Sequence, residues 1–203
     1  MIELKNISKT YKTGKVEFHA LKSIDLEINK GEFIAIMGPS GSGKSTLMHL
    51  IGFLDTPDSG KYIFKGEDIS KFSDDELAIL RNKTIGFVFQ QFQLVPYLTA
   101  LENVMLPLII TDVPNQEEKA ALMLARVGLG KKLKHLPSEL SGGEQGRVAI
   151  ARAIVNEPPI LLADEPTGTL DSQTGAEVLD LFAELHQEGQ TIVMVTHSDH
   201  TAA

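Results

Sequence analysis

One short stretch of this 203-residue sequence, GPSGSGKST, has the residue types and spacing of a phosphate-binding loop. It matches the pattern G-x-x-x-x-G-K-[ST] between an apolar run and a helical pattern, which is the context that the motif requires. Glycines let backbone N–H groups turn inward around phosphate oxygens, and a following helix N-terminus adds partial positive charge. Lys44 is expected to reach the β- and γ-phosphates, and the Ser45 hydroxyl is expected to bind Mg²⁺. The predicted contacts are Gly38, Ser40, Gly41, Ser42, Gly43, Lys44, Ser45 and Thr46.

Two adjacent carboxylates, Asp164 and Glu165, follow the apolar run ILLA and form a second candidate site. Because neighbouring residues of a strand point to opposite faces, we expect the two side chains to have different roles. Asp164 is the expected partner of Mg²⁺, directly or through water. Glu165 is then free to polarise a water molecule for attack on the γ-phosphate. A polar strand end in a solvated turn is the alternative, and it is less favoured beside a phosphate loop.

Three other residues at strand ends are weaker candidates, because each also has an ordinary structural explanation. Gln90, after IGFVF, is expected to contact Mg²⁺ and the attacking water, although a glutamine at a strand end is commonly just solvated. His197, after TIVMVT, is expected to hydrogen-bond the γ-phosphate, although such a histidine is more often structural. Tyr11 is expected to stack on an adenine ring, although a tyrosine at a strand end is often simply half-buried.

The stretch LSGGEQGRVAIARA starts with two glycines where a helix is expected to begin. Ser141 and Glu144 fit a capping box, so helix capping alone explains them. The N–H groups of Gly142 and Gly143 also suit an anion. Because one phosphate loop serves one nucleotide, a second anion site makes sense if it closes over the nucleotide of another subunit. Gly146, inside the helix, is expected to weaken it by about 1 kcal/mol relative to alanine.

Apolar patterns predict the elements that position these residues. Alternation in Ile2–Tyr11 and Val16–Asn29 predicts an antiparallel pair with a turn at Gly14 and Lys15. The runs FIAIM, IGFVF, ILLA and TIVMVT predict strands of a parallel sheet covered by helices. Each run is followed by candidate residues, and ligands bind beyond the carboxyl ends of such strands. Helical patterns cover residues 44–51, 73–82, 141–156 and 172–188.

The stretch from about residue 92 to 137 interrupts the strand–helix alternation and is expected to be a helical subdomain, broken by Pro107 and Pro114. We therefore predict one domain, residues 1–203, with residues 1–91 and 138–203 forming a β subdomain plus core.

Composition narrows the function classes. The net charge of −8 argues against broad nonspecific nucleic-acid binding. No apolar run reaches the roughly 18 residues that span a bilayer, and the start shows no signal-peptide pattern. The absence of cysteine excludes disulfides and thiolate metal sites, and it fits a reducing cytosol.

Together, the motifs resemble the ATP-binding-cassette (ABC) ATPase family over essentially the whole chain. The phosphate loop GPSGSGKST, the glutamine loop FVFQQ, the signature LSGGE, the acidic strand ILLADEP, GTLD and the terminal His197 occur in the family's order. The segments FVFQQFQLVPYLTALENV and GFLDTPDSG resemble those of the lipoprotein-releasing (LolD), macrolide-export (MacB) and cell-division (FtsE) branch. The resemblance implies an α/β fold: a P-loop NTPase (RecA-like) core with a mostly parallel sheet, an N-terminal antiparallel β subdomain and an inserted α-helical subdomain.

The resemblance also implies ATP and Mg²⁺ as cofactors, ATP hydrolysis coupled to transport, and a head-to-tail homodimer with ATP between phosphate loop and signature. Across that dimer, Ser141–Gly143 would contact the γ-phosphate, Glu144 would approach the ribose and Asp171 would read the partner. An integral-membrane permease would bind near Gln90 and the helical subdomain, which puts the chain on the cytoplasmic face of the cell membrane. No nucleic-acid partner is expected.

Two features depart from the family pattern. Members often carry glutamine at the position of Gly146, so we expect Gly146→Gln or Gly146→Ala to raise the melting temperature. The chain also stops six residues after His197, where members continue with another strand and helices, and this is expected to affect the packing of the loop at His197. Two alternatives remain: a soluble non-transport ABC ATPase acting on ribosomes or DNA, and a nucleotide-binding module without turnover.

Overall fold

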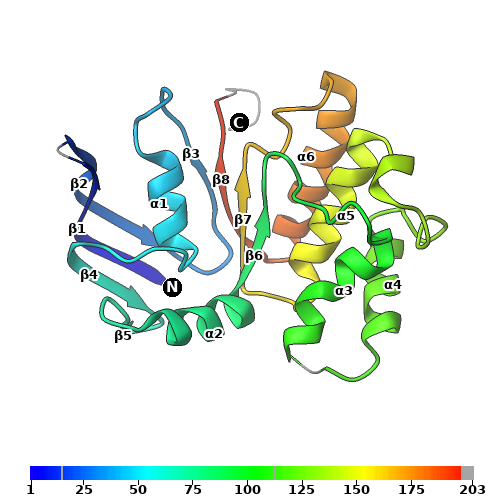
Figure 1. The fold of residues 1–203 in the computed structure, drawn as a ribbon, viewed down its shortest axis with the longest axis horizontal. Helices are drawn as coiled ribbons and strands as arrows, with labels where there is room; N and C mark the ends of the chain where they lie inside the picture. The colour runs from blue at the N-terminus through cyan, green and yellow to red at the C-terminus, as the bar shows by residue number, and fades with distance from the viewer. Residues whose placement is uncertain (15, 112, 198–203) are drawn as a thin grey trace.

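The computed structural model describes residues 1–14, 16–111 and 113–197, and within these ranges the chain forms two four-stranded sheets and six α-helices (Figure 1). Helix α1 (Lys44–Ile51) lies between the two sheets. Helices α5 (Gly142–Ile154) and α6 (Ser172–Gln187) cover the other face of the parallel sheet. The fold is therefore layered as sheet, helix, sheet and helices, which confirms the predicted α/β class.

The antiparallel sheet has the order β2-β1-β4-β5. Its strands are β1 (Ile2–Thr13), β2 (Val16–Ile28), β4 (Ser59–Phe64) and β5 (Glu67–Asp68). The predicted pairing of the first two strands is confirmed, with Tyr11 opposite Phe18, while Lys15 of the predicted turn lies outside the described residues. Strands β4 and β5 were not predicted, because their short, half-polar segments carry no clear period.

The parallel sheet has the order β3-β8-β7-β6. Its strands are β3 (Phe33–Ile36), β6 (Ile85–Val88), β7 (Ile160–Asp164) and β8 (Thr191–Val195), as the four apolar runs predicted. Strand β8 is buried along its whole length. Strand β3 is only half-buried, because it is an outer strand of the described sheet and pairs with β8 alone.

Strand β7 joins two hydrophobic cores, because its side chains alternate between its faces. Leu161 and Ala163 pack in the core with α5 and α6. Ile160 and Leu162 pack in the core with α1 and the antiparallel sheet. Both faces of the strand are thereby held, and Asp164 emerges in a defined place at its carboxyl end.

The other helices are α2 (Asp74–Thr84), α3 (Ala100–Thr111) and α4 (Gln116–Arg126), with a short 3₁₀ helix at Pro137–Glu139. The prediction that Pro107 breaks the helical pattern was wrong, since α3 continues through it. Buried Val104 and Leu108 on either side pack in the core shared with α4 and α5, and this packing outweighs the one lost hydrogen bond. Among the described helices, none combines the length and apolar character needed to cross a bilayer. The boundary of the helical subdomain stays a prediction.

Candidate functional site

Three candidate side chains meet at the carboxyl edge of the parallel sheet, the upper edge in Figure 1. Gln90 follows β6, Glu165 follows β7 and His197 follows β8. His197 Nε2 lies 2.7 Å from Glu165 Oε1, and Gln90 Nε2 donates to Glu165 Oε2 at 3.1 Å. The two oxygens of one carboxylate are thus each bound from a different strand end.

Glu165 is not a strand residue, so the reason given for its separate role was wrong. Strand β7 ends at Asp164, and Glu165 follows in the left-handed region with φ 45°. Its N–H donates to the Val195 carbonyl of β8 at 2.9 Å, which holds this conformation. A left-handed non-glycine residue is strained, and active sites are one place where such strain is maintained by the surrounding structure. The turn directs the carboxylate toward Gln90 and His197.

The loop after β3 has the geometry of an anion cradle. Gly38 and Gly43 have φ values of 152° and 94°. A Cβ on Gly43 would lie 2.4 Å from the Ala20 carbonyl oxygen, so only glycine fits there. Lys44 is buried, and its Nζ donates to the carbonyl oxygens of Gly38 at 2.8 Å and Pro39 at 2.9 Å. The ammonium group therefore lies within the loop whose phosphate it is expected to bind.

The charge balance beside this loop suits a divalent cation. Burial raises the pKa of Asp164, and the neighbouring charge of Glu165 raises it further, although nearby His49 and Lys44 oppose the shift. A cation beside Asp164 would relieve both effects. The hydroxyl of Ser45, the carboxylate of Asp164 and the amide oxygen of Gln90 are the kind of ligands that Mg²⁺ prefers. The residues present therefore fit Mg²⁺ and a nucleoside triphosphate.

Tyr11 lies on β1 and points toward the link that follows α1. Tyr11 is 37% exposed, and its hydroxyl donates to Asp55 Oδ2 at 2.8 Å. Burial and the hydrogen bond to Asp55 raise its pKa, while a hydrogen bond with Thr46 of the phosphate loop lowers it. Tyr11 is thus beside the cradle, as adenine stacking requires, and stacking itself stays a prediction. Asp55 was not recognised from the sequence as part of this site.

The predicted capping box at the start of α5 is confirmed. The Glu144 N–H donates to Ser141 Oγ at 3.3 Å, and the Ser141 N–H donates to Glu144 Oε2 at 2.9 Å. Gly142 is exposed, whereas Gly143 is buried against α6, where an added Cβ would lie 2.1 Å from Thr174 Cγ2. Of the two glycines expected to offer N–H groups, only Gly142 therefore lies at the surface.

Sequence reasoning missed a structural role of Asp171. Its side chain caps α6, with Oδ1 accepting hydrogen bonds from the N–H groups of Gln173 at 3.1 Å and Thr174 at 3.0 Å. The helix pattern that begins at Ser172 was a signal for this cap, since aspartate is a preferred N-cap residue. Asp171 therefore has a local role whether or not it contacts a partner.

Gly146 packs closely against the segment that follows Gln90. An added Cβ would lie 3.2 Å from Phe92 Cε1 and 3.6 Å from Val178 Cγ2. Arg152, farther along α5, donates to the Phe92 carbonyl at 2.6 Å and the Gln93 carbonyl at 2.7 Å. Gly146 thus has a packing role that the helix pattern did not indicate.

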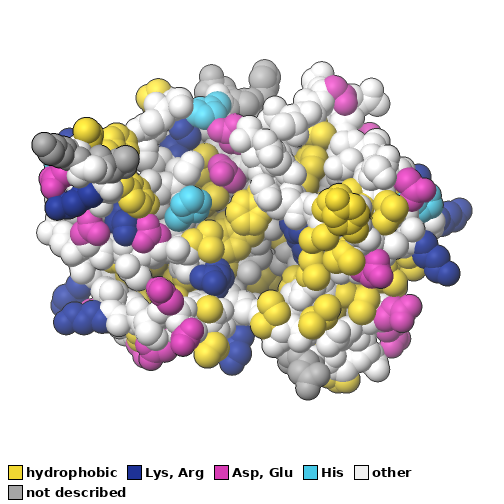
Figure 2. Space-filling view, viewed as in Figure 1, with side chains coloured by type: hydrophobic (Ala, Val, Ile, Leu, Met, Phe, Trp, Pro, Cys, Tyr) yellow, Lys and Arg dark blue, Asp and Glu magenta, His cyan; other side chains and the backbone are white. Residues whose placement is uncertain are grey.

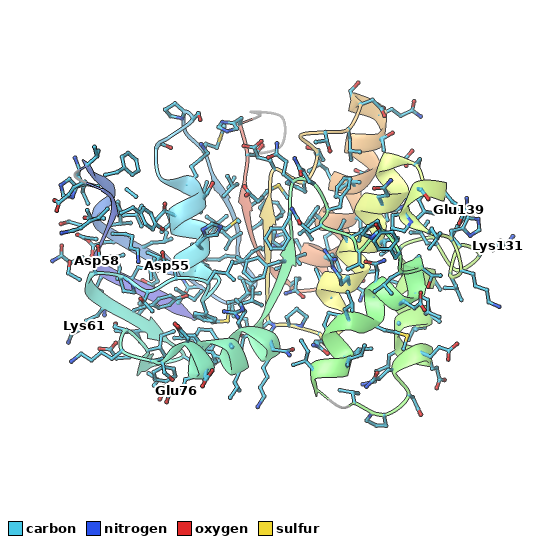
Figure 3. The ribbon with its side chains drawn as sticks, viewed as in Figure 1. Asp55, Asp58, Lys61, Glu76, Lys131 and Glu139 are labelled. Atoms are coloured by element: carbon cyan, nitrogen blue, oxygen red, sulfur yellow. The ribbon has the colours of Figure 1, made fainter. Side chains whose placement is uncertain are left out.

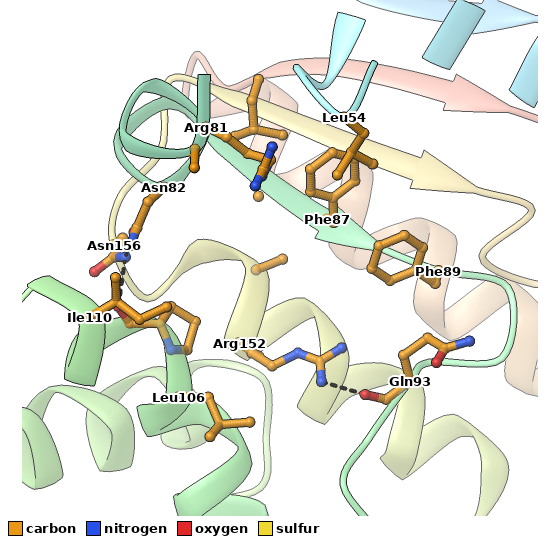
Figure 4. Close-up of a pocket in the computed structure, with 15 residues that line it drawn as sticks. Leu54, Arg81, Asn82, Phe87, Phe89, Gln93, Leu106, Ile110, Arg152 and Asn156 are labelled. Carbon is orange, nitrogen blue, oxygen red and sulfur yellow. Dashed lines mark hydrogen bonds between the residues drawn. The ribbon is translucent and has the colours of Figure 1, made fainter. Parts of the chain in front are cut away.

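A groove of about 480 Å³ lies beside this segment, between the α2–β6 side of the molecule and helices α3 and α5 (Figure 4). Figure 2 shows hydrophobic side chains gathering in the hollow of this face and over its α3 side. Two arginines, Arg81 and Arg152, also line the groove. Its large apolar side chains are Leu54, Ile85, Phe87, Phe89, Leu106 and Ile110.

Comparisons with known proteins agree with this geometry. The family model described as ABC transporter matches residues 21–168. The uncharacterized ABC transporter ATP-binding protein YknY of Bacillus subtilis is 56% identical, over 100% of this chain and 89% of that protein. The macrolide export ATP-binding/permease protein MacB of Nitrosomonas europaea is 54% identical, and the chain spans 31% of its length. The ATP-binding cassette MJ0796, solved as a dimer in a post-hydrolysis state bound to ADP and Pi, superposes with a TM-score of 0.90 at 48% identity, covering 100% of this chain and 90% of that one.

Proposed function

This chain belongs to the ABC transporter family, and on that premise we propose that Glu165 directs the ATP hydrolysis by which it drives a membrane permease. ATP and Mg²⁺ are its cofactors, and a similar cassette has been solved with ADP and Pi. The single observation that carries the proposal is the carboxylate of Glu165, held between Gln90 and His197 at the carboxyl end of β7.

Each candidate residue at the carboxyl edge of the parallel sheet has a role in hydrolysis that its position supports. Bound ATP supplies the γ-phosphorus that water attacks, and Mg²⁺ neutralises part of the phosphate charge. Lys44 and the backbone N–H groups of the glycine loop hold the phosphates. Glu165 polarises the water and accepts its proton, and His197 orients the carboxylate through the 2.7 Å contact. Ser45, Gln90 and Asp164 are suited to hold Mg²⁺.

A second copy of the chain completes the site. The parallel sheet separates the glycine loop, on the α1 side, from the start of α5 (Figure 1). The exposed Ser141 and Gly142 therefore face away from their own nucleotide, and the opposing loop of a head-to-tail partner is the natural recipient. The N–H of the buried Gly143 is proposed to contribute from behind them. Glu144 and Asp171 are proposed to approach the same partner. The dimeric form of the similar cassette supports this arrangement.

The groove between α2 and α3 is the proposed permease site. It is open and apolar, Ile110 is 77% exposed, and it adjoins the segment that contains Gln90. The name of the MacB relative joins an ATP-binding part to a permease part, which supports such a partner. Because a permease lies in the membrane and ATP is supplied in the cytoplasm, we propose that the chain works on the cytoplasmic face.

The test is steady-state phosphate release, measured beside ATP binding. We expect Glu165→Gln to bind ATP but to release phosphate roughly 10²- to 10⁴-fold more slowly than the wild type. Glu118→Gln, on the exposed surface of α4, is the matched control and should behave as wild type. Wild-type turnover by Glu165→Gln would contradict the assigned role. ATP binding without phosphate release by the wild type, with permease present, would favour a module without turnover.

A further inference from the structure

Asp55 ties the link after α1 to strand β1. Its Oδ1 accepts a hydrogen bond from Lys9 Nζ at 2.6 Å, and its Oδ2 accepts one from the Tyr11 hydroxyl at 2.8 Å. Lys9 and Tyr11 are two residues apart on β1, so they share one face of the strand. One carboxylate thus holds both side chains on the face that looks toward α1. Figure 3 labels Asp55 at this end of the molecule.

The ion pair between Lys9 and Asp55 is largely buried, and Asp58 Oδ1 lies 3.8 Å from the same ammonium group. The Lys9 side chain is 11% exposed, and its Nζ also donates to the Thr56 carbonyl at 2.7 Å. Burial raises the pKa of Asp55, but hydrogen bonds from Lys9, Tyr11 and the Thr56 N–H outweigh it, so the net pKa is lowered. The carboxylate is therefore ionised at neutral pH, with both oxygens engaged.

A second aspartate fastens the same link. Asp58 Oδ2 accepts the Thr10 N–H at 2.6 Å, and the Asp58 N–H donates to the Ser8 carbonyl at 2.9 Å. Asp58 lies beside Asp55 in Figure 3. The link from Asp55 to Asp58 is thus attached to β1 at several points, and Asp55 has little freedom to move away from Tyr11.

This attachment sets where the Tyr11 ring lies relative to the phosphate loop. Helix α1 begins at Lys44 and leads directly into the link that carries Asp55, so the ring is tied to the helix that carries the phosphate-binding residues. Lys9 Nζ lies over the ring, 5.4 Å from its centroid, and occupies one of its faces. Tyr11 is 37% exposed, so part of its ring is open to a nucleotide base.

We propose that Asp55 and Lys9 are positioning residues for base recognition, which hold the Tyr11 ring at the distance from the phosphate loop that a purine nucleoside triphosphate requires. The inference rests on the proposed nucleotide site at Tyr11. Neither Asp55 nor Lys9 touches the nucleotide, because their polar atoms are engaged with each other, with Tyr11 and with Thr56.

The test compares a ligand that has a base with one that lacks it. Binding of Mg·ATP and of Mg·tripolyphosphate is measured for the wild type, Asp55→Asn, Tyr11→Phe and the double variant. We expect each single variant to weaken ATP binding by about three- to tenfold, with no loss of tripolyphosphate binding. Asp55→Asn should raise KM for ATP with little change in kcat. Asp75→Asn, an exposed aspartate on α2, is the control.

The double variant separates a shared interaction from two independent ones. If Asp55 acts through the Tyr11 hydroxyl, the double variant binds ATP about as weakly as either single variant. Additive losses, or an equal loss of tripolyphosphate binding, would overturn the proposal. Should Asp55→Asn fail to fold, Tyr11→Phe still removes the contact with Asp55. Because it also removes the hydrogen bond with Thr46, unchanged tripolyphosphate binding is then the evidence that the phosphate loop is undisturbed.

Tyr11→Ala distinguishes failure of this proposal from failure of the proposed base site at Tyr11, on which it rests. Unchanged ATP affinity in Tyr11→Ala would mean that the base does not bind at Tyr11, and the proposed base site would be wrong. Weaker ATP binding in Tyr11→Ala, with wild-type affinity in Asp55→Asn and Tyr11→Phe, would contradict the positioning role of Asp55 and leave the base site at Tyr11 standing.

Discussion

At the scale of single residues, Glu165 has properties that no local pattern describes. Its left-handed backbone, its contact with His197 and its contact with Gln90 come from three strand ends that are far apart in the sequence. Such a conformation is strained in a non-glycine residue, and the neighbouring strand β8 holds it by a backbone hydrogen bond. The carboxylate is thereby held in one orientation by contacts within the chain.

Gly146 is a second residue whose surroundings matter, because they change the effect that its substitution is expected to have on stability. Replacing glycine by alanine inside a helix stabilises it by about 1 kcal/mol. Here the added Cβ would meet Phe92 at 3.2 Å, so part of that gain is offset by a shift of the ring. We now expect Gly146→Ala to remain within about 1 kcal/mol of the wild type, and Gly146→Gln to lose about 1–3 kcal/mol through overpacking.

Urea unfolding of both Gly146 variants measures this. Combining Gly146→Ala with Phe92→Leu should recover the helix gain relative to Phe92→Leu alone, because the obstructing ring is gone. A Gly146→Gln protein more stable than the wild type would restore the original hypothesis, that the glycine only loosens α5.

At the scale of elements, the start of α5 combines a cap with the exposed Gly142, which is proposed to bind an anion. A hydrogen bond from the Ser141 N–H lowers the pKa of Glu144, although burial opposes the shift. A lowered pKa means that the ionised form stabilises the fold at neutral pH and that this contribution is lost as pH falls through the lowered value. The acidic side chain also favours the N-terminal end of the helix dipole.

We therefore expect Glu144→Gln, which keeps the acceptor but removes the charge, to be less stable than the wild type at pH 7 by about 0.3–1 kcal/mol. The difference should shrink below the ordinary glutamate pKa of about 4.3 and vanish once Glu144 is protonated. Melting temperatures between pH 7 and pH 3 measure it. Glu184→Gln, at an exposed position on α6, is the control for loss of one glutamate charge, and a gap in Glu144→Gln that does not change with pH would contradict the charge argument.

At the scale of the whole molecule, the two halves of the proposed ATP site lie on opposite sides of the parallel sheet (Figure 1). Within one chain, the glycine loop GPSGSGKST therefore has no LSGGE segment opposite it, and the LSGGE segment has no nucleotide site opposite it. In the proposed dimer, each half is joined to its complement, and ATP is part of the interface.

Gly142→Asp tests this arrangement. The new carboxylate favours its own helix N-terminus, and its Cβ meets only the flexible end of Leu170, so the fold should persist. The same charge would repel the γ-phosphate of a partner's ATP. We expect ATP binding by the monomer to remain, while ATP-dependent dimerisation in a Glu165→Gln background, followed by light scattering, is lost.

Mixing two inactive chains gives the sharper outcome. A dimer of Lys44→Ala with Gly142→Asp has one site in which both the glycine loop and the signature are intact. Phosphate release should therefore reappear on mixing, although each variant alone is inactive. Normal turnover by Gly142→Asp alone, or no recovery in a mixture shown to form heterodimers, would contradict a site shared between chains.

Much of the fold was readable from the sequence, because its signals are local. Period-two and continuous apolar runs predicted two strands of one sheet and all four of the other, and helical patterns predicted α1, α2, α5 and α6 to within a few residues, with a cap recognised only for α5. The short strands β4 and β5 were missed, and Pro107 was given too much weight, because non-local pairing and packing decide both.

The sequence by itself determined the chemistry of this protein: a phosphate loop, an acidic strand end and a glycine-rich helix start, each defined by residue type and close spacing. Only the tertiary structure decided which side chains act together. The contacts of Glu165 with His197, of Asp55 with Tyr11 and of Gly146 with Phe92 join distant segments. Such contacts arise from how sheets and helices pack, and packing has no short-range signature in the chain.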